Sequence, residues 1–71
     1  MLKYHINIFF SDEDALYVAD IPDLKACSAL GSTPEEALAE VLIAKQAWLD
    51  SARENGISIP EPRYRPSVDA R

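Results

Sequence analysis

The stretch STPEEALAEVLIAKQAWLDSARENG, residues 32–56, decides the fold of this chain. Thr33 is a good helix cap, Pro34 suits the first helical position, and Glu36 follows the cap by three residues, which is a capping box. The Asn-Gly pair that closes the stretch favours a left-handed stop. The sequence therefore predicts one helix over residues 34–54, about 31 Å long at roughly 1.5 Å per residue.

Apolar residues recur at every third or fourth position of this predicted helix and form one stripe. The stripe contains Ala37, Val41, Ala44, Trp48 and Ala52, and Leu38, Leu42 and Leu49 widen it. Ile43 lies well off the stripe. The stripe is the face that we expect to cover a sheet, so the rest of the chain must supply that sheet.

Alternating apolar and polar residues predict the strands of the sheet. Residues 2–10 alternate with β-branched and aromatic types, which is typical of a strand. The SDED segment, residues 11–14, predicts a turn, and residues 15–21 predict a second strand antiparallel to the first. Residues 26–30 are weakly patterned and predict a short third strand.

The order of these elements predicts the fold class. Residues 57–59 have room for one more short strand before Pro60. The order β-β-β-α-β predicts an α+β two-layer sandwich, with an antiparallel sheet of three to four strands packed on one long helix. Residues 1–62 form the predicted domain, and residues 63–71 form a tail with proline and arginine that we expect to be extended or disordered.

Length and charge narrow the possible functions. A chain of 71 residues makes one domain that is marginal alone, which favours oligomerisation or a bound partner. Residues 1–62 carry eleven acidic against four basic side chains, a net charge of −7, and residues 63–71 add +2, for a total of −5. An acidic body repels nucleic acid and attracts basic proteins, so we expect no direct DNA binding. The chain shows no membrane span or signal peptide, and we expect a cytoplasmic protein.

Individual residues with catalytic or metal-binding chemistry have a structural interpretation beside the functional one. His5 can be a general base or an exposed or interfacial structural residue, and Cys27 can be a nucleophile or a small buried residue. Residues 12–14 can hold a cation or form a solvated turn, but they lack the EF-hand pattern. In each case the structural interpretation is favoured, so we predict no catalytic, metal or cofactor-binding residue.

Two candidate association surfaces remain. The candidate self-association surface consists of Phe9, Leu16, Val18 and Ile43, which are apolar and outside the expected core. The candidate surface for a basic protein partner consists of Asp12, Glu13, Asp14, Asp20 and Asp23.

Several segments in a fixed order resemble the HicB-like antitoxin family. They are YVADIPDL at residues 17–24, Cys27, GSTPEEAL at residues 31–38, AWL at residues 47–49 and NGISIPEP at residues 55–62. The resemblance implies a domain like a truncated ribonuclease H fold without nuclease carboxylates. It also implies binding of a small basic HicA-type toxin, whose active site the antitoxin covers, and homodimers or tetramers.

Two departures from the family pattern limit this resemblance. Ala26 stands where the family commonly has glycine, so we expect a different local turn. Many members continue into a DNA-binding domain, for which the residues after Pro62 leave no room, so operator binding is not expected.

Three functions follow as hypotheses. The first is a non-enzymatic antitoxin module that neutralises a small basic mRNA-cleaving toxin. The second is an orphan homo-oligomeric structural domain of the same fold without a toxin partner. The third is a residual nuclease or hydrolase.

Overall fold

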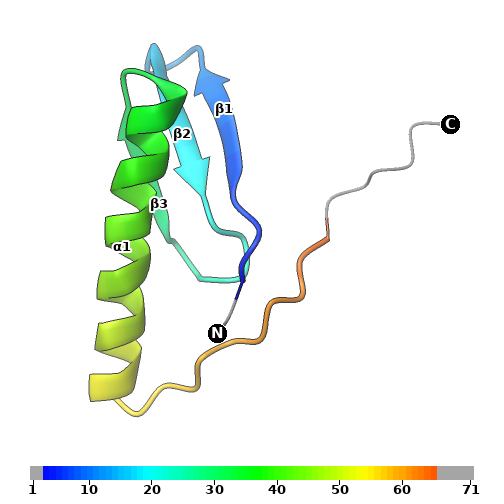
Figure 1. The fold of residues 1–71 in the computed structure, drawn as a ribbon, viewed down its shortest axis with the longest axis vertical. Helices are drawn as coiled ribbons and strands as arrows, with labels where there is room; N and C mark the ends of the chain where they lie inside the picture. Colours follow the sequence, from blue (N-terminus) through cyan, green and yellow to red (C-terminus); the bar gives the residue numbers. More distant parts are fainter. Residues whose placement is uncertain (1–2, 66–71) are drawn as a thin grey trace, which may run out of the picture.

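The fold has two layers, a three-stranded sheet and one long helix packed against it (Figure 1). A computed structural model describes residues 3–65. The elements are β1 (Asn7–Ser11), β2 (Leu16–Asp20), β3 (Ser28–Gly31) and α1 (Pro34–Glu54). The sheet is antiparallel with the order β1-β2-β3, so β2 is the middle strand. The predicted α+β two-layer fold is therefore confirmed.

Helix α1 occupies the predicted residues 34–54, and its ends are capped as the local sequence indicates. The Thr33 hydroxyl accepts a hydrogen bond from the backbone N–H of Glu36 at 3.0 Å. The Glu36 carboxylate accepts one from the backbone N–H of Ser32, one residue before the cap. Gly56 has a φ of +68°, the left-handed conformation that ends a helix.

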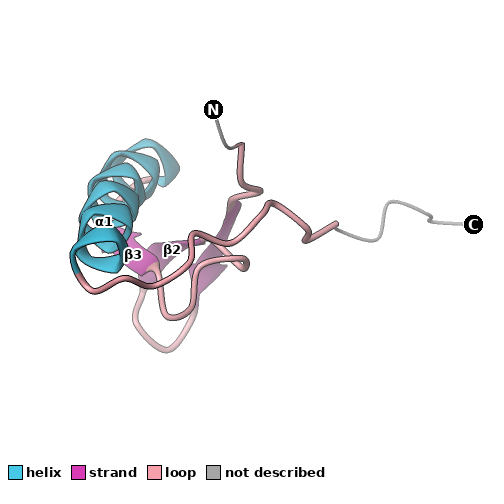
Figure 2. Ribbon diagram, turned by 90° about the horizontal axis from the view of Figure 1, so that it is seen from below, coloured by secondary structure: helices cyan, strands magenta, loops and turns pink. Residues whose placement is uncertain are grey.

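Helix α1 lies over β2 and β3 and leaves β1 largely uncovered (Figure 2). Gly31 permits this close approach, because a Cβ there would lie 2.4 Å from the backbone nitrogen of Ala37. Ala37 and Val41 are fully buried against the sheet. The expectation that Leu38 and Leu42 cover the sheet is wrong: they are 37% and 41% exposed. These two leucines lie on a side of the helix that does not face β2 or β3, the strands that α1 covers.

The first strand is shorter than predicted. It begins at Asn7, residues 3–6 are not a strand, and residue 2 lies outside the described residues. The partner strand β2 ends at Asp20, and the backbone N–H of Ile21 donates to the carbonyl of Cys27 at 3.0 Å rather than pairing with β1. Residues 3–6 therefore have no strand beside them.

The second and third strands begin later than predicted, because an alanine with positive φ precedes each of them. Ala15 has a φ of +55°, and β2 begins one residue later. Ala26 has a φ of +60°, and β3 begins at Ser28 rather than at residue 26. A left-handed residue cannot continue a strand, because strands need extended backbone dihedrals.

The predicted strand at residues 57–59 is absent from the described sheet. The backbone N–H of Ile57 donates to the carbonyl of Ala52 at 2.8 Å, and the Tyr4 hydroxyl donates to the carbonyl of Pro60 at 2.6 Å. The segment after the helix is thus held by a turn and a side chain, not by a strand ladder.

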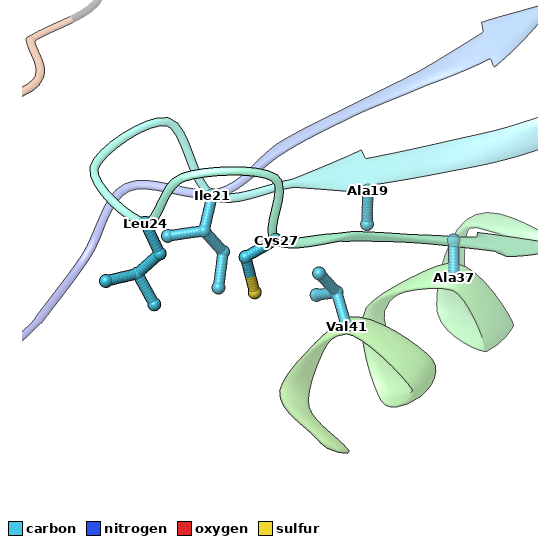
Figure 3. Packing of buried hydrophobic residues seen from close by; sticks show 6 residues of the cluster. All are labelled: Ala19, Ile21, Leu24, Cys27, Ala37 and Val41. Atoms are coloured by element: carbon cyan, nitrogen blue, oxygen red, sulfur yellow. The ribbon is translucent and has the colours of Figure 1, made fainter. Parts of the chain in front are cut away.

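The core is small and lies between the sheet, the loop after β2 and the helix (Figure 3); it consists of Ala19, Ile21, Leu24, Cys27, Ala37 and Val41. Ile21 and Leu24, from the loop after β2, point toward Val41 on the helix, with Cys27 beside them. Tyr4 and Trp48 pack against this cluster and are partly buried.

Candidate protein-binding surface

Among the described residues, the sheet face that points away from α1 has no second layer. Phe9 pairs with Val18, and Val18 pairs with Leu30, so the three side chains form one row across the sheet. Ala19, the next residue of β2, is fully buried under the helix, which places the row on the other face. Phe9 is 50% exposed and Leu30 is 47% exposed. An accessible apolar row of this kind is a candidate association surface.

Polar side chains flank the apolar row on the same face. Residues that share this face, called the open face below, are Asn7, Phe9, Ser11, Leu16, Val18, Asp20, Ser28 and Leu30. Asp20 is the only charged residue within the three strands. An apolar centre with a polar margin is the usual arrangement of a protein interface.

The structure brings together three of the four residues predicted for self-association. Phe9, Leu16 and Val18 all lie on the open face. Ile43 does not join them, because it lies on the outer side of α1 and is 65% exposed. Sequence reasoning missed Leu30, because the weak pattern of the third strand carries no signal for its register with β2.

The structure separates the five predicted acidic residues. They are Asp12, Glu13, Asp14, Asp20 and Asp23. The first three, called the acidic turn below, are exposed between β1 and β2. Within this turn, the Ser11 hydroxyl donates to the Asp14 carboxylate at 3.1 Å. Asp20 and Asp23 belong to the opposite end of β2. The acidic residues therefore do not form one site.

Asp23 joins two segments that are distant in the sequence. Its carboxylate accepts hydrogen bonds from the backbone N–H groups of Arg63 and Tyr64, each at 3.1 Å. Sequence reasoning assigned Asp23 to a partner surface, because no local pattern indicates a contact across 40 residues. Residues 63 and 64 begin the expected tail, whose last residues, 66–71, lie outside the described residues.

His5 is part of the same junction. Its Nε2 donates to the side-chain oxygen of Asn7 at 2.7 Å. Its ring packs at a tilt against Tyr64, with 5.0 Å between the ring centroids. These contacts connect the start of the chain to the segment after the helix.

Cys27 is 5% exposed and lies in the core cluster. Burial raises the pKa of its thiol above the ordinary value, and the positive charge of Lys45 partly opposes this shift. At neutral pH the thiol is therefore protonated, which is its weakly nucleophilic form.

A shallow groove of about 690 Å³ runs between the second half of α1 and the loop before β3. The Trp48 Nε1 donates to the carbonyl of Lys25 at 2.9 Å within this region. Ala44 and Ala47 line the groove on the same flank of the helix. This flank of α1 therefore faces the segment that enters β3.

Residues 3–65 offer neither a group of metal ligands nor a membrane-spanning helix. In this part of the chain, no three His, Cys, Asp or Glu side chains are grouped so that they could hold a metal ion. Within the same range, no helix combines the length and the apolar character that crossing a bilayer requires.

The geometry defines a small two-layer α+β domain with one uncovered sheet face, and comparison with known proteins places the chain in a family. The chain is 43% identical over 59 residues to UPF0150 protein ssl0259 of Synechocystis, covering 83% of this chain and 80% of that protein. It is 36% identical over 59 residues to UPF0150 protein Ta0767 of Thermoplasma acidophilum, covering 83% of this chain and 84% of that protein. The chain belongs to the UPF0150 family. No family model matches it, and no solved structure matches it.

Proposed function

We propose that this chain is a non-enzymatic protein-binding module of the HicB-like antitoxin type, acting in the cytoplasm. It neutralises a small basic mRNA-cleaving toxin of the HicA type by covering the toxin's active surface. The observation that carries this proposal is the open face, where Phe9, Val18 and Leu30 form an accessible apolar row beside Asp20. Protein interfaces commonly combine such an apolar centre with a polar margin.

Charge supports a basic partner. The chain has a net charge of −5, and the acidic turn projects from one end of the sheet. Charge of opposite sign on the partner speeds association and makes the rate sensitive to salt. The ordered motifs that resemble HicB-like antitoxins point to the same class of partner.

The proposal requires a small basic protein encoded beside this chain, and the test is a binding measurement with that protein. The Leu30→Lys variant places a positive charge on the open face, and we expect its affinity to fall by about tenfold or more, the range of an interface anchor. Ile43→Lys is the matched control, because Ile43 is exposed on the outer side of the helix, and its affinity should stay unchanged.

A growth assay gives the functional readout. Co-expression of this chain should restore growth of cells that express the neighbouring basic protein, and Leu30→Lys should restore it less than Ile43→Lys. The proposal fails if the basic protein does not bind, or if the two variants neutralise it equally well.

A further inference from the structure

We propose that two copies of this chain form a two-fold dimer in which their β1 strands pair antiparallel about Phe9, making one continuous six-stranded sheet. This inference does not depend on the proposed function. It rests on the edge position of β1 and on the match of its side chains to a second copy of itself.

β1 is an edge strand without the usual protection against pairing. In the described sheet it pairs with β2 alone. Natural edge strands are commonly blunted by charged residues, proline or a bulge, and the NIFFS sequence of β1 has none of these. Its three central residues are exposed: Ile8 by 39%, and Phe9 and Phe10 by 50% each. The strand therefore offers both backbone hydrogen-bonding groups and apolar side chains.

Symmetry restricts the possible registers. In an antiparallel pair, directly opposed residues lie on the same face of the sheet. Two opposed residues of a symmetric pair are therefore an even number of positions apart in the sequence. One residue at the centre then lies on the two-fold axis, opposite its own copy. With the axis at Phe9, Phe9 opposes its own copy on the open face, and Ile8 opposes Phe10 on the helix face. Asn7 then opposes Ser11. Each side chain meets one of similar polarity.

The neighbouring registers do not match in this way. An axis at Ile8 sets the amide of Asn7 against Phe9. An axis at Phe10 sets Ile8 against the carboxylate of Asp12. Both place a polar or charged group against an apolar side chain, which disfavours them.

The helices add apolar surface to the same interface. A two-fold axis perpendicular to the sheet keeps both helices on one side of it. Leu38 and Leu42 lie on the flank of α1 opposite to Ala44 and Ala47, which face the segment before β3, so the two leucines point toward the β1 side. In the dimer these half-exposed leucines from both copies would flank Ile8 and Phe10.

The self-matching side chains of β1 favour a second copy as the occupant. Pairing about Phe9 sets Glu13 of one copy opposite His5 of the other, at the end of β1 where the chain begins (Figure 1). That end carries the basic residues Lys3, Arg63 and Arg65 together with the acidic residues Asp20, Asp23 and Glu61. Within residues 3–65 of a single copy, neither these side chains nor the acidic turn forms an ion pair. The two-fold axis places Glu13 opposite His5 at both ends of the paired strands.

The first test measures the mass of the full chain in solution by analytical ultracentrifugation. We expect a dimer of twice 7.9 kDa. Phe9→Lys sets two like charges face to face and should raise the dissociation constant by about tenfold or more, whereas Ile43→Lys should leave it unchanged. Circular dichroism of both variants verifies that they are folded.

The second test fixes the register by cross-linking. A cysteine opposite its own copy has a Cα–Cα distance of about 4.5–5.5 Å, within the range of about 4.4–6.8 Å that a disulfide bridges. Phe9→Cys should therefore form a disulfide-linked dimer under mild oxidation. Phe10→Cys, which opposes Ile8, should not, and neither should the wild type, whose Cys27 is buried. A wild-type monomer at millimolar concentration, or a dimer in which Phe10→Cys cross-links and Phe9→Cys does not, would overturn the proposal.

Discussion

The Tyr4 hydroxyl donates a hydrogen bond of 2.6 Å to the backbone carbonyl of Pro60, which lies 56 residues further along the chain. This bond fixes the segment that follows the helix against the residues that precede β1. It occupies the place where the sequence predicted a strand ladder. At the end of the molecule opposite the acidic turn, a side-chain contact therefore takes the place of strand pairing.

We expect Tyr4→Phe to lower the free energy of unfolding by about 1 kcal/mol, because the Pro60 carbonyl loses its donor. In a domain of this size that corresponds to a fall in melting temperature of about 4–8 °C. Thermal unfolding followed by circular dichroism measures it. An unchanged melting temperature would show that the bond contributes nothing to stability.

The same variant makes a prediction about pH. Burial, followed by the negative charges of Asp23 and Glu61, raises the pKa of Tyr4 above its ordinary value of 10.0. The folded state thus holds this proton more tightly than the unfolded state, so the contribution is present below pH 10 and is lost as pH rises beyond it. Wild-type stability should fall more steeply above pH 10 than that of Tyr4→Phe, as measured by urea unfolding at several pH values.

Ala26→Gly should stabilise the fold. Ala26 has a φ of +60°, which is costly for alanine and free for glycine, and we expect a gain of about 0.5–1 kcal/mol. Ala29→Gly in β3 is the control: Ala29 has no such φ and is partly buried, so this change should destabilise. Urea unfolding of both variants decides, and a loss of stability in Ala26→Gly would contradict the argument.

Gly31→Ala should destabilise by about 1–3 kcal/mol, because the added methyl group meets helix backbone, which cannot move away as a flexible side chain can. Gly56→Ala is the control, because it introduces backbone strain without a clash. Gly56 has a positive φ but open space around it, so we expect only the strain of about 1 kcal/mol. Amide hydrogen exchange should show faster opening of the first turns of α1 in Gly31→Ala only.

Cys27 should react slowly with thiol reagents in the native state. Its burial and raised pKa keep it protonated and inaccessible, so we expect alkylation at least about 100-fold slower than in urea. Its raised pKa also means that its contribution to stability is lost as pH rises above the ordinary value of 9.0. Mass spectrometry after timed iodoacetamide treatment measures the rate. Equal rates in buffer and in urea would show that Cys27 is accessible.

The parts of the fold that depend on local signals could be predicted from the sequence. The helix begins and ends as predicted because Thr33, Pro34, Glu36 and Gly56 act on backbone groups within a few residues. The strands are less well predicted at their ends, because a strand exists only where a partner lies beside it. Residues 3–6 alternate correctly but lack that partner after β2 turns away at Ile21.

The candidate surface could likewise be predicted only where its residues are related by local sequence. Alternation along β1 and β2 was enough to group Phe9, Leu16 and Val18. Leu30 joins them only through the register of β3, and Asp23 is engaged only through the fold of the segment after the helix. Neither relationship has a local signature in the sequence.

The Asp23 carboxylate closes a loop of 40 residues onto Arg63, and this has a consequence for the order of folding. The β1–β2 hairpin and helix α1 form from contacts that are close in sequence, whereas this bond requires both to be in place. We therefore infer that it forms late and opens first. Opening there would release residues 61–65, beyond the Tyr4–Pro60 bond, while the sheet and helix remain folded, so a protease should cut this segment long before the rest of the domain unfolds.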